Sequence, residues 1–362
     1  MRAVNTFHCN VCQSLLFFEN VSCLGCGHML AYLPDTGTIA ALEQDASGLY
    51  HPTPRVTPSR AYRLCANYTS HQVYNWAVAA EDEHTLCRSC RLTRMIPDIS
   101  APESQAAWYR LEAAKRRVIY TLRHLALPLD SKQEAADGLA FDFLQDTVLP
   151  NGDSTRVLTG HDNGVITINV AETDDLLREQ QRREHNEPYR TLLGHFRHET
   201  GHYYWDRLVR DGPSLEEFRA RFGDERADYG AALRRHYEQG PPPRWDQDFV
   251  SAYASSHPWE DWAESWAHYL HMTDALETAS SMGLSLRPIR RDEPSMPAPA
   301  DPLRTGRAEF DQMMEGWLPL TYMLNNLSRG LGQRDNYPFV LSPAVIDKLR
   351  FVHQVIIARR PV

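Results

Sequence analysis

Apolar and polar positions recur with the period of an α-helix along much of the chain after residue 100. The clearest case is residues 103–126, where apolar residues lie on one side of a helical projection and charged residues on the other. The residues on the apolar side are Trp108, Leu111, Val118, Leu122 and Leu125. The same pattern predicts further helices from about residue 188 and over 214–222, 224–238, 258–272, 309–328 and 343–359.

Residues 155–170 have a different pattern. A run of β-branched residues that alternates apolar and polar positions follows the turn sequence HDNG. This pattern predicts a β-hairpin. Together with the helices, it indicates one mixed α+β domain from about residue 100 to the end of the chain.

Composition and charge narrow the class of protein. The chain has 42% hydrophobic and 23% charged residues, which is ordinary for a globular protein. Its formal net charge of −9 argues against a protein whose whole surface is basic and binds nucleic acid. No apolar run approaches the roughly 20 residues that a membrane span requires, and the first residues lack a signal-peptide layout. We therefore expect a soluble cytoplasmic protein without membrane contact, in which thiols stay reduced and can bind metal.

Two CxxC pairs mark the N-terminal segment. Cys9 and Cys12 form the first pair, Cys23 and Cys26 the second, and ten residues separate the pairs. Each pair can place two thiolates on one cation, so the two pairs supply the four soft ligands that tetrahedral Zn²⁺ prefers. We interpret residues 1–50 as a zinc ribbon whose closed site serves folding and docking. A redox dithiol is the alternative use of such pairs.

A second, incomplete cluster follows the proline-rich sequence HPTPRVTPSR. Its three thiolates come from Cys65, Cys87 and Cys90. The nearby candidates for a fourth ligand are His71 and His84, and we favour His71 because His84 lies only three residues before Cys87. If the cluster has lost its fourth ligand, residues 51–100 form a cysteine-rich segment that binds no metal.

The sequence His198-Glu199-Thr200-Gly201-His202 is the motif that indicates chemistry. Positions four apart on a helix share a face, so His198 and His202 can bind one Zn²⁺. Glu199 follows the first histidine directly and can accept a proton from a water molecule that the metal polarises. This is the HExxH arrangement of metalloproteases. An exposed amphipathic helix with incidental histidines is the structural alternative.

A catalytic zinc site usually has three protein ligands and one open position. No third histidine follows at the spacing HExxHxxGxxH, but Glu260, Glu264 and His268 lie four apart and share a helical face. One of the two carboxylates can bind zinc while the other hydrogen-bonds a ligand histidine, and their spacing does not rank them. Asp206, one turn after His202, is a further candidate for orienting a ligand histidine.

Four segments together resemble a family of bacterial zinc-binding metallopeptidases with an N-terminal zinc ribbon. These segments are the CxxC…CxxC ribbon, CRSCRL, HETGHYYW and EDWAESWAHYL, which follow this order over most of the chain. The resemblance implies an α+β fold, with a small zinc-ribbon region before a mostly helical, zincin-like domain that contains a short mixed sheet. We expect the ribbon at 1–50, the second cysteine-rich segment at 51–100 and the peptidase domain at 101–362. The chain departs from the family at Tyr74, where members usually have a cysteine of the second cluster.

A second, local resemblance concerns Tyr253 and the run from Glu260 to Glu264. This region is similar to the C-terminal helix of the anthrax lethal factor type of gluzincin. In that type, a tyrosine lies seven residues before the first glutamate of an ExxAE motif. The resemblance implies that Glu260 is the third zinc ligand, that Tyr253 stabilises the oxyanion and that Glu264 supports the ligands.

We therefore expect a zinc metallopeptidase with one catalytic and one or two structural zinc ions, acting on a peptide or protein substrate. The strand expected within 160–170 could align that substrate by edge pairing. The alternative is a catalytically inactive adaptor that uses its ribbon to bind a protein or nucleic-acid partner. Glu199 favours the enzyme because a structural metal site has no need of a general base. The near-neutral charge of residues 1–100 disfavours nucleic acid.

Overall fold

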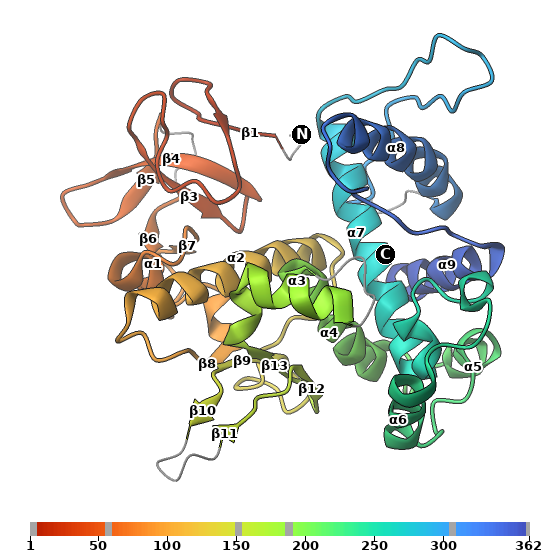
Figure 1. The fold of residues 1–362 in the computed structure, drawn as a ribbon. Helices are drawn as coiled ribbons and strands as arrows, with labels where there is room; N and C mark the ends of the chain where they lie inside the picture. The colour runs from red at the N-terminus through yellow and green to blue at the C-terminus, as the bar shows by residue number, and fades with distance from the viewer. Residues whose placement is uncertain (1–5, 55–59, 149–153, 185–190, 304–308, 360–362) are drawn as a thin grey trace.

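The computed structural model describes residues 6–54, 60–148, 154–184, 191–303 and 309–359. The fold is of the α+β class, with an N-terminal zinc-ribbon region followed by a mostly helical domain. Figure 1 shows the N-terminal strands above helix α2 (Pro102–His124), a second sheet below it, and the helices of the C-terminal part gathered around the long helix α7 (Pro258–Ser281). None of the helices in these ranges combines the length and the apolar character that a bilayer span needs.

The N-terminal region contains a small hairpin and a five-stranded antiparallel sheet. The hairpin consists of β1 (Phe7–His8) and β2 (Leu15–Leu16). The sheet has its strands in chain order: β3 (Met29–Leu33), β4 (Thr38–Gln44), β5 (Tyr50–Pro52), β6 (Tyr62–Leu64) and β7 (Ala77–Ala79). The expected division at residue 50 falls inside β5, so the sheet continues from the first cysteine-rich segment into the second. The short helix α1 (Ala66–His71) connects β6 to β7.

Helix α2 (Pro102–His124) confirms the helix predicted at 103–126 and joins the two parts of the molecule. On one side, Tyr120 packs against Phe18 and Tyr32, with ring centroids 5.4 and 6.1 Å apart. The buried carboxylate of Glu112 pairs with Lys115 at 2.7 Å on the same helix. Another side of α2 contacts α4, so one helix packs against both the ribbon and the helix that contains His198 and His202.

A four-stranded mixed sheet lies below α2 in the order β12-β13-β9-β8. Its strands are β8 (Thr93–Met95), β9 (Ala140–Leu144), β12 (Gly160–Asp162) and β13 (Val165–Asn169), and only the β12–β13 pair is antiparallel. That pair confirms the predicted hairpin, because Asn163 and Gly164 both have the positive φ that a two-residue I′ turn requires. A two-stranded hairpin, β10 (Thr147–Val148) and β11 (Ser154–Thr155), precedes it.

The helical part is built around α4 (Leu192–Leu208) and α7 (Pro258–Ser281). The other helices are α3 (Asp175–Glu184), α5 (Leu215–Phe222), α6 (Tyr229–Gln239), α8 (Phe310–Gly330) and α9 (Pro343–Ala358). The helix expected from about 188 begins at Leu192, and residues 188–190 lie outside the described ranges. The helix expected at 224–238 begins later, because Asp228 caps it by accepting a hydrogen bond from the backbone of Ala231.

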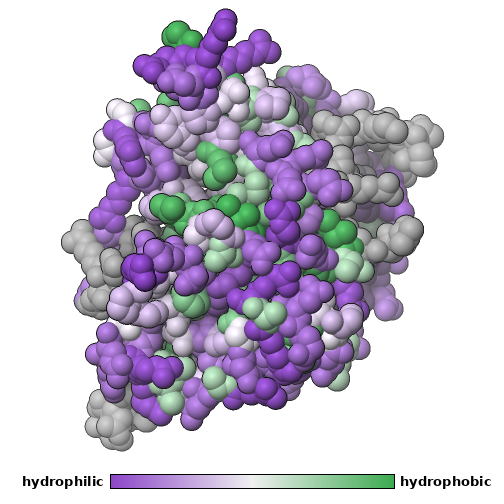
Figure 2. Space-filling model, turned by 90° about the vertical axis from the view of Figure 1, so that its right-hand side faces the viewer, coloured by the Kyte–Doolittle hydropathy of each residue, from purple (hydrophilic) through white to green (hydrophobic). Residues whose placement is uncertain are grey.

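The outer surface of this helical part is mostly polar. Figure 2 views the molecule from the right-hand side of Figure 1 and shows hydrophilic residues over most of that face, with hydrophobic residues gathered near its middle. Inside, Phe141 and Phe143 of β9 pack against Phe196 of α4, with ring centroids 5.7 and 6.0 Å apart. The mixed sheet therefore supports the helix that carries the HExxH motif.

Candidate metal centre and active site

Helices α4 and α7 approach each other unusually closely at Gly201. A Cβ atom at this position would lie 2.9 Å from Cα of Ala263 and 3.2 Å from Cβ of Trp266. The indole Nε1 of Trp262 donates a hydrogen bond of 2.9 Å to the backbone oxygen of Gly201. Because glycine has no side chain, the two helices can approach closely here, and their polar residues come together.

Three ligand atoms converge where these helices meet. Nε2 of His198 lies 3.2 Å from Nε2 of His202, and Oε2 of Glu260 lies 3.0 Å and 3.5 Å from these two nitrogens. Atoms bound to one tetrahedral Zn²⁺ at 2.0–2.1 Å are about 3.3 Å apart, so the spacing fits zinc. Oε2 of Glu260 is buried and has no hydrogen-bond partner among the described residues, which is the state expected of a metal-ligating oxygen.

The geometry distinguishes the two carboxylates that their spacing alone left unranked. Oε1 of Glu264 lies 2.8 Å from Nδ1 of His198, the ring nitrogen that faces away from the convergent atoms. The hydroxyl of Ser251 donates to Oε2 of Glu264 at 2.6 Å. Burial alone would raise the pKa of Glu264, but the hydrogen bond with His198 and the charge of that ring lower it to about 2. Glu264 therefore stays ionised and fixes the orientation of the His198 ring.

Glu199 lies beside the convergent atoms and has a free oxygen. Its side chain is 8% exposed, and its Oε2 has no hydrogen-bond partner in the described part of the chain. Burial raises the pKa of Glu199, although His198 and His202 oppose this rise. Glu199 therefore has one buried carboxylate oxygen available for a further partner.

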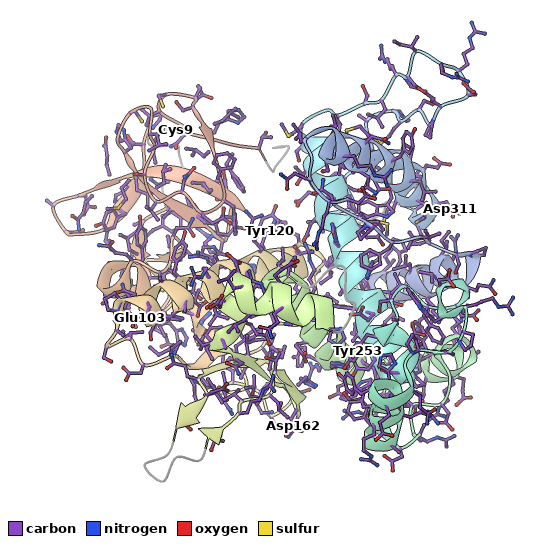
Figure 3. All side chains as sticks on the ribbon, viewed as in Figure 1. Cys9, Glu103, Tyr120, Asp162, Tyr253 and Asp311 are labelled. Carbon is purple, nitrogen blue, oxygen red and sulfur yellow. The ribbon has the colours of Figure 1, made fainter. Side chains whose placement is uncertain are left out.

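Tyr253 lies beside His198. It belongs to a single turn of 3₁₀ helix, η4 (Tyr253–Ser256), and its ring centroid is 5.9 Å from that of His198. Figure 3 labels Tyr253 beside the crossing of the central helices, far from Cys9 of the ribbon. Burial and the negative charge of Glu260 hold the pKa of Tyr253 well above its ordinary value, so its hydroxyl remains a donor.

A cleft of about 810 Å³ lies beside this group of residues. His198, Glu199, Tyr253 and Glu264 are among its lining residues. The cleft continues along both central helices, and residues 338–340 form part of its wall. It is large enough for several residues of a peptide beside the metal position.

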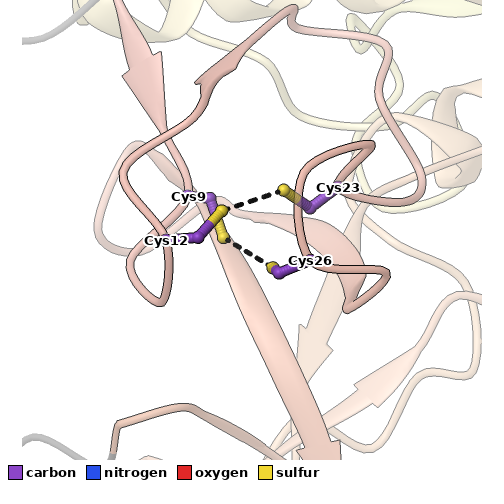
Figure 4. Close-up of side chains that lie close together, drawn as sticks. All are labelled: Cys9, Cys12, Cys23 and Cys26. Atoms are coloured by element: carbon purple, nitrogen blue, oxygen red, sulfur yellow. Dashed lines mark hydrogen bonds between the residues drawn. The ribbon is translucent and has the colours of Figure 1, made fainter.

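The four cysteines of the ribbon form a second convergent group. Figure 4 shows that the two CxxC turns face each other, with Sγ–Sγ distances of 3.6 Å between Cys9 and Cys26 and 3.5 Å between Cys12 and Cys23. Sulfur atoms bound to one zinc ion at about 2.3 Å are roughly 3.8 Å apart, so this group fits a closed tetrahedral site.

Comparison with known proteins agrees with this geometry. Residues 104–355 match the family described as "Putative zinc-binding metallo-peptidase", and residues 6–101 match a zinc-ribbon domain family. The chain belongs to this metallopeptidase family. It is also 43% identical over 352 residues to uncharacterized proteins of Mycobacterium bovis and of two strains of Mycobacterium tuberculosis, covering 97% of this chain and 94% of theirs. No solved structure matches the chain.

The second cysteine cluster of this family member differs from the expectation. Cys65, Cys87 and Cys90 lie together and are buried, but no histidine or carboxylate in the described ranges joins them. His71, which was predicted as the fourth ligand, does not join the three thiolates. Its ring packs on Trp108 instead, with centroids 5.3 Å apart. Cys65 caps the start of α1 and His71 ends it, so the helix carries the histidine about 9 Å along its axis away from the thiolates.

Three other features of this cluster differ from a complete zinc site. The amide nitrogen of Asn67 donates to Sγ of Cys90 at 3.2 Å. Tyr74, which stands where the family usually has a cysteine, hydrogen-bonds Glu112 through its hydroxyl. His84, the other candidate ligand, lies 2.8 Å from a carboxylate oxygen of Asp82.

The structure also differs from the prediction that Asp206 orients a ligand histidine. Its carboxylate pairs with Arg210, one turn further along α4. Nδ1 of His202, the atom that Asp206 would have contacted, has no hydrogen-bond partner among the described residues.

Several residues at the site were not found from the sequence. The hydroxyl of Tyr229 donates to Oε1 of Glu260 at 2.6 Å. The ring of Trp259 packs on His202, with centroids 4.3 Å apart. His161 of β12 lies parallel to the same histidine at 6.4 Å. Of these three residues, only Trp259 is adjacent to a residue that the sequence analysis selected, namely Glu260. The local sequence could therefore have indicated Trp259 but not the other two.

Proposed function

We propose that this metallopeptidase-family protein hydrolyses peptide bonds in the cleft beside helices α4 and α7. The observation that carries the proposal is the convergence of His198, His202 and Glu260 next to the unpaired carboxylate oxygen of Glu199. Two histidines and one carboxylate are a frequent ligand set of catalytic zinc, and three protein ligands leave one position open. A site that only stabilised the fold would need neither the open position nor a carboxylate beside it.

In this proposal, His198, His202 and Glu260 hold zinc, which when bound supplies the Lewis acidity that activates water and polarises the scissile carbonyl. Glu199 accepts the proton of the attacking water and later delivers it to the leaving amine. Burial raises the pKa of this carboxyl group and so makes its carboxylate a better base. Glu264 holds the ring of His198 in place throughout.

Tyr253 is proposed to donate a hydrogen bond to the oxygen on which negative charge develops. Its hydroxyl stays protonated in this environment, and a donor that is already oriented stabilises a developing oxyanion without reorganisation. Its distance in sequence from Glu260, seven residues, agrees with the lethal factor type of gluzincin.

The mixed sheet offers an edge to which an extended substrate could add. Strand β13 is paired on both sides, with β12 and with β9, so it is excluded from this role. Strand β12 is one of the two edge strands of this sheet, and its residue His161 lies beside His202. We propose that the backbone of β12 aligns the peptide along the metal position, in the manner of strand addition.

One paired measurement tests the function. Zinc per chain and cleavage of a diverse peptide library are determined for the wild-type protein and for Glu199→Gln. We expect equal zinc content and loss of cleavage in the variant, because the amide keeps the size of the side chain but accepts no proton. A wild-type protein that holds zinc at His198 and cleaves no peptide would contradict the proposal and favour a binding protein.

A further inference from the structure

The carboxylate of Glu260 is held at both of its oxygens. Oε2 faces the two histidine nitrogens, whereas Oε1 accepts the hydrogen bond of 2.6 Å from the hydroxyl of Tyr229. Glu260 is only 1% exposed, so bulk water does not compete for Oε1. Tyr229 lies 31 positions before Glu260 and belongs to a different helix.

The chain fixes Tyr229 in this position. It is the first residue of α6, directly after the capping residue Asp228. The preceding Ala227 accepts a hydrogen bond of 3.1 Å from Nε2 of His257, and the rings of Tyr229 and His257 are 5.2 Å apart. The other ring nitrogen of His257 accepts from the backbone of Trp259 and so caps α7. One histidine thus connects the starts of the two helices that supply Tyr229 and Glu260.

The hydrogen bond between these two residues has a defined direction. An ionised carboxylate carries no proton and can only accept, so the hydroxyl of Tyr229 is the donor. Tyr229 is 38% exposed, whereas the carboxylate that it contacts is buried.

We propose that Tyr229 is a positioning residue that holds Glu260 as a one-oxygen ligand of the metal. This inference rests on the proposed function, because it assumes zinc at His198, His202 and Glu260. A carboxylate can bind zinc through one oxygen or through both. With Oε1 engaged by Tyr229, only Oε2 is offered, and the coordination position that a second oxygen would fill remains open for water or substrate.

The inference is tested with Tyr229→Phe, which removes one hydroxyl and keeps the ring. The matched control is Tyr322→Phe, the same change at a tyrosine of α8 that is 54% exposed. Both variants are treated with dipicolinate to empty the histidine site while the thiolate sites keep zinc, and Co²⁺ is then added. The visible spectrum of His202→Ala, prepared in the same way, is subtracted. Thermal unfolding without added metal checks that each variant is folded.

We expect the wild-type protein and Tyr322→Phe to give the intense visible bands of four-coordinate Co²⁺. Tyr229→Phe should give weaker bands, typical of a higher coordination number, and should bind zinc about 10- to 100-fold more weakly. A folded Tyr229→Phe with the wild-type spectrum and affinity would overturn this inference and leave the proposed function intact. A wild-type spectrum equal to that of His202→Ala would instead overturn both.

Discussion

The close approach of the two central helices at Gly201 permits a quantitative prediction. In Gly201→Ala, the new methyl group would lie 2.9 Å from Cα of Ala263, whereas ordinary contacts between carbon atoms are about 3.5–4.0 Å. No rotation of a side chain relieves a clash between a Cβ atom and a backbone atom. Helices α4 and α7 must therefore separate locally by roughly 0.6–1 Å.

This separation has a cost in stability. Overpacking of a core typically costs about 1–3 kcal/mol, and a clash with backbone belongs to the upper part of that range. Alanine gains about 0.5–1 kcal/mol over glycine inside a helix, which offsets part of the cost. We expect the free energy of unfolding to fall by about 2 kcal/mol. The same movement carries His202 away from Glu260, so zinc should also bind more weakly.

The assay is urea unfolding of the metal-free protein, followed by titration with zinc. Gly230→Ala on α6 is the matched control, because its nearest neighbour is the end of the flexible side chain of Arg234, at 3.4 Å. That variant should be as stable as the wild-type protein or slightly more stable. If Gly201→Ala unfolds at the same urea concentration and binds zinc equally well, the close approach does not organise the metal site.

Three further predictions concern other groups. Glu260→Ala should abolish zinc binding at the histidine site, whereas Glu264→Ala should weaken it by about 10- to 100-fold, and the reverse order in zinc titrations would show that the ligand assignment is wrong. Glu277 has a pKa raised to about 9, mainly by burial, so its folded state retains a proton that the unfolded chain releases above its ordinary pKa of 4.5. Stability should therefore fall as pH rises from about 5 to 9, and Glu277→Gln should remove this slope in thermal melts and stabilise the protein by up to a few kcal/mol at pH 8. Cys23→Ser should lower the zinc content by one ion per chain without affecting the histidine site, and an unchanged content would contradict the ribbon.

Local patterns predicted those elements whose own sequence determines them. Helix α2 has a strongly periodic apolar face, and the β12–β13 turn contains the Asn-Gly pair that its backbone requires. Helix α3 was missed because residues 175–184 are mostly charged or amide side chains and offer little apolar periodicity. Strand β5 was missed because it has only three residues, the last two of which begin the proline-rich sequence HPTPRVTPSR.

The residues of the candidate site also divide into those that local spacing predicts and those that only the tertiary fold brings together. His198, Glu199 and His202 lie on one helix, so their spacing alone places them on one face. The pairing of Tyr229 with Glu260 links helices 31 positions apart and has no counterpart in local spacing. His71 was chosen for its nearness in sequence to the cysteines, but the direction of α1 decides where its ring lies.

The position of α2 has a practical consequence for anyone who wishes to isolate the peptidase part. The match to the metallopeptidase family begins at residue 104, within the first turn of that helix. A chain cut there would expose to water the aromatic side of α2 on which Phe18 and Tyr32 rest. It would also leave Arg117 without Glu19, which lies 2.7 Å away in the ribbon. We expect such a fragment to aggregate, because the boundary between the two family matches passes through a hydrophobic interior.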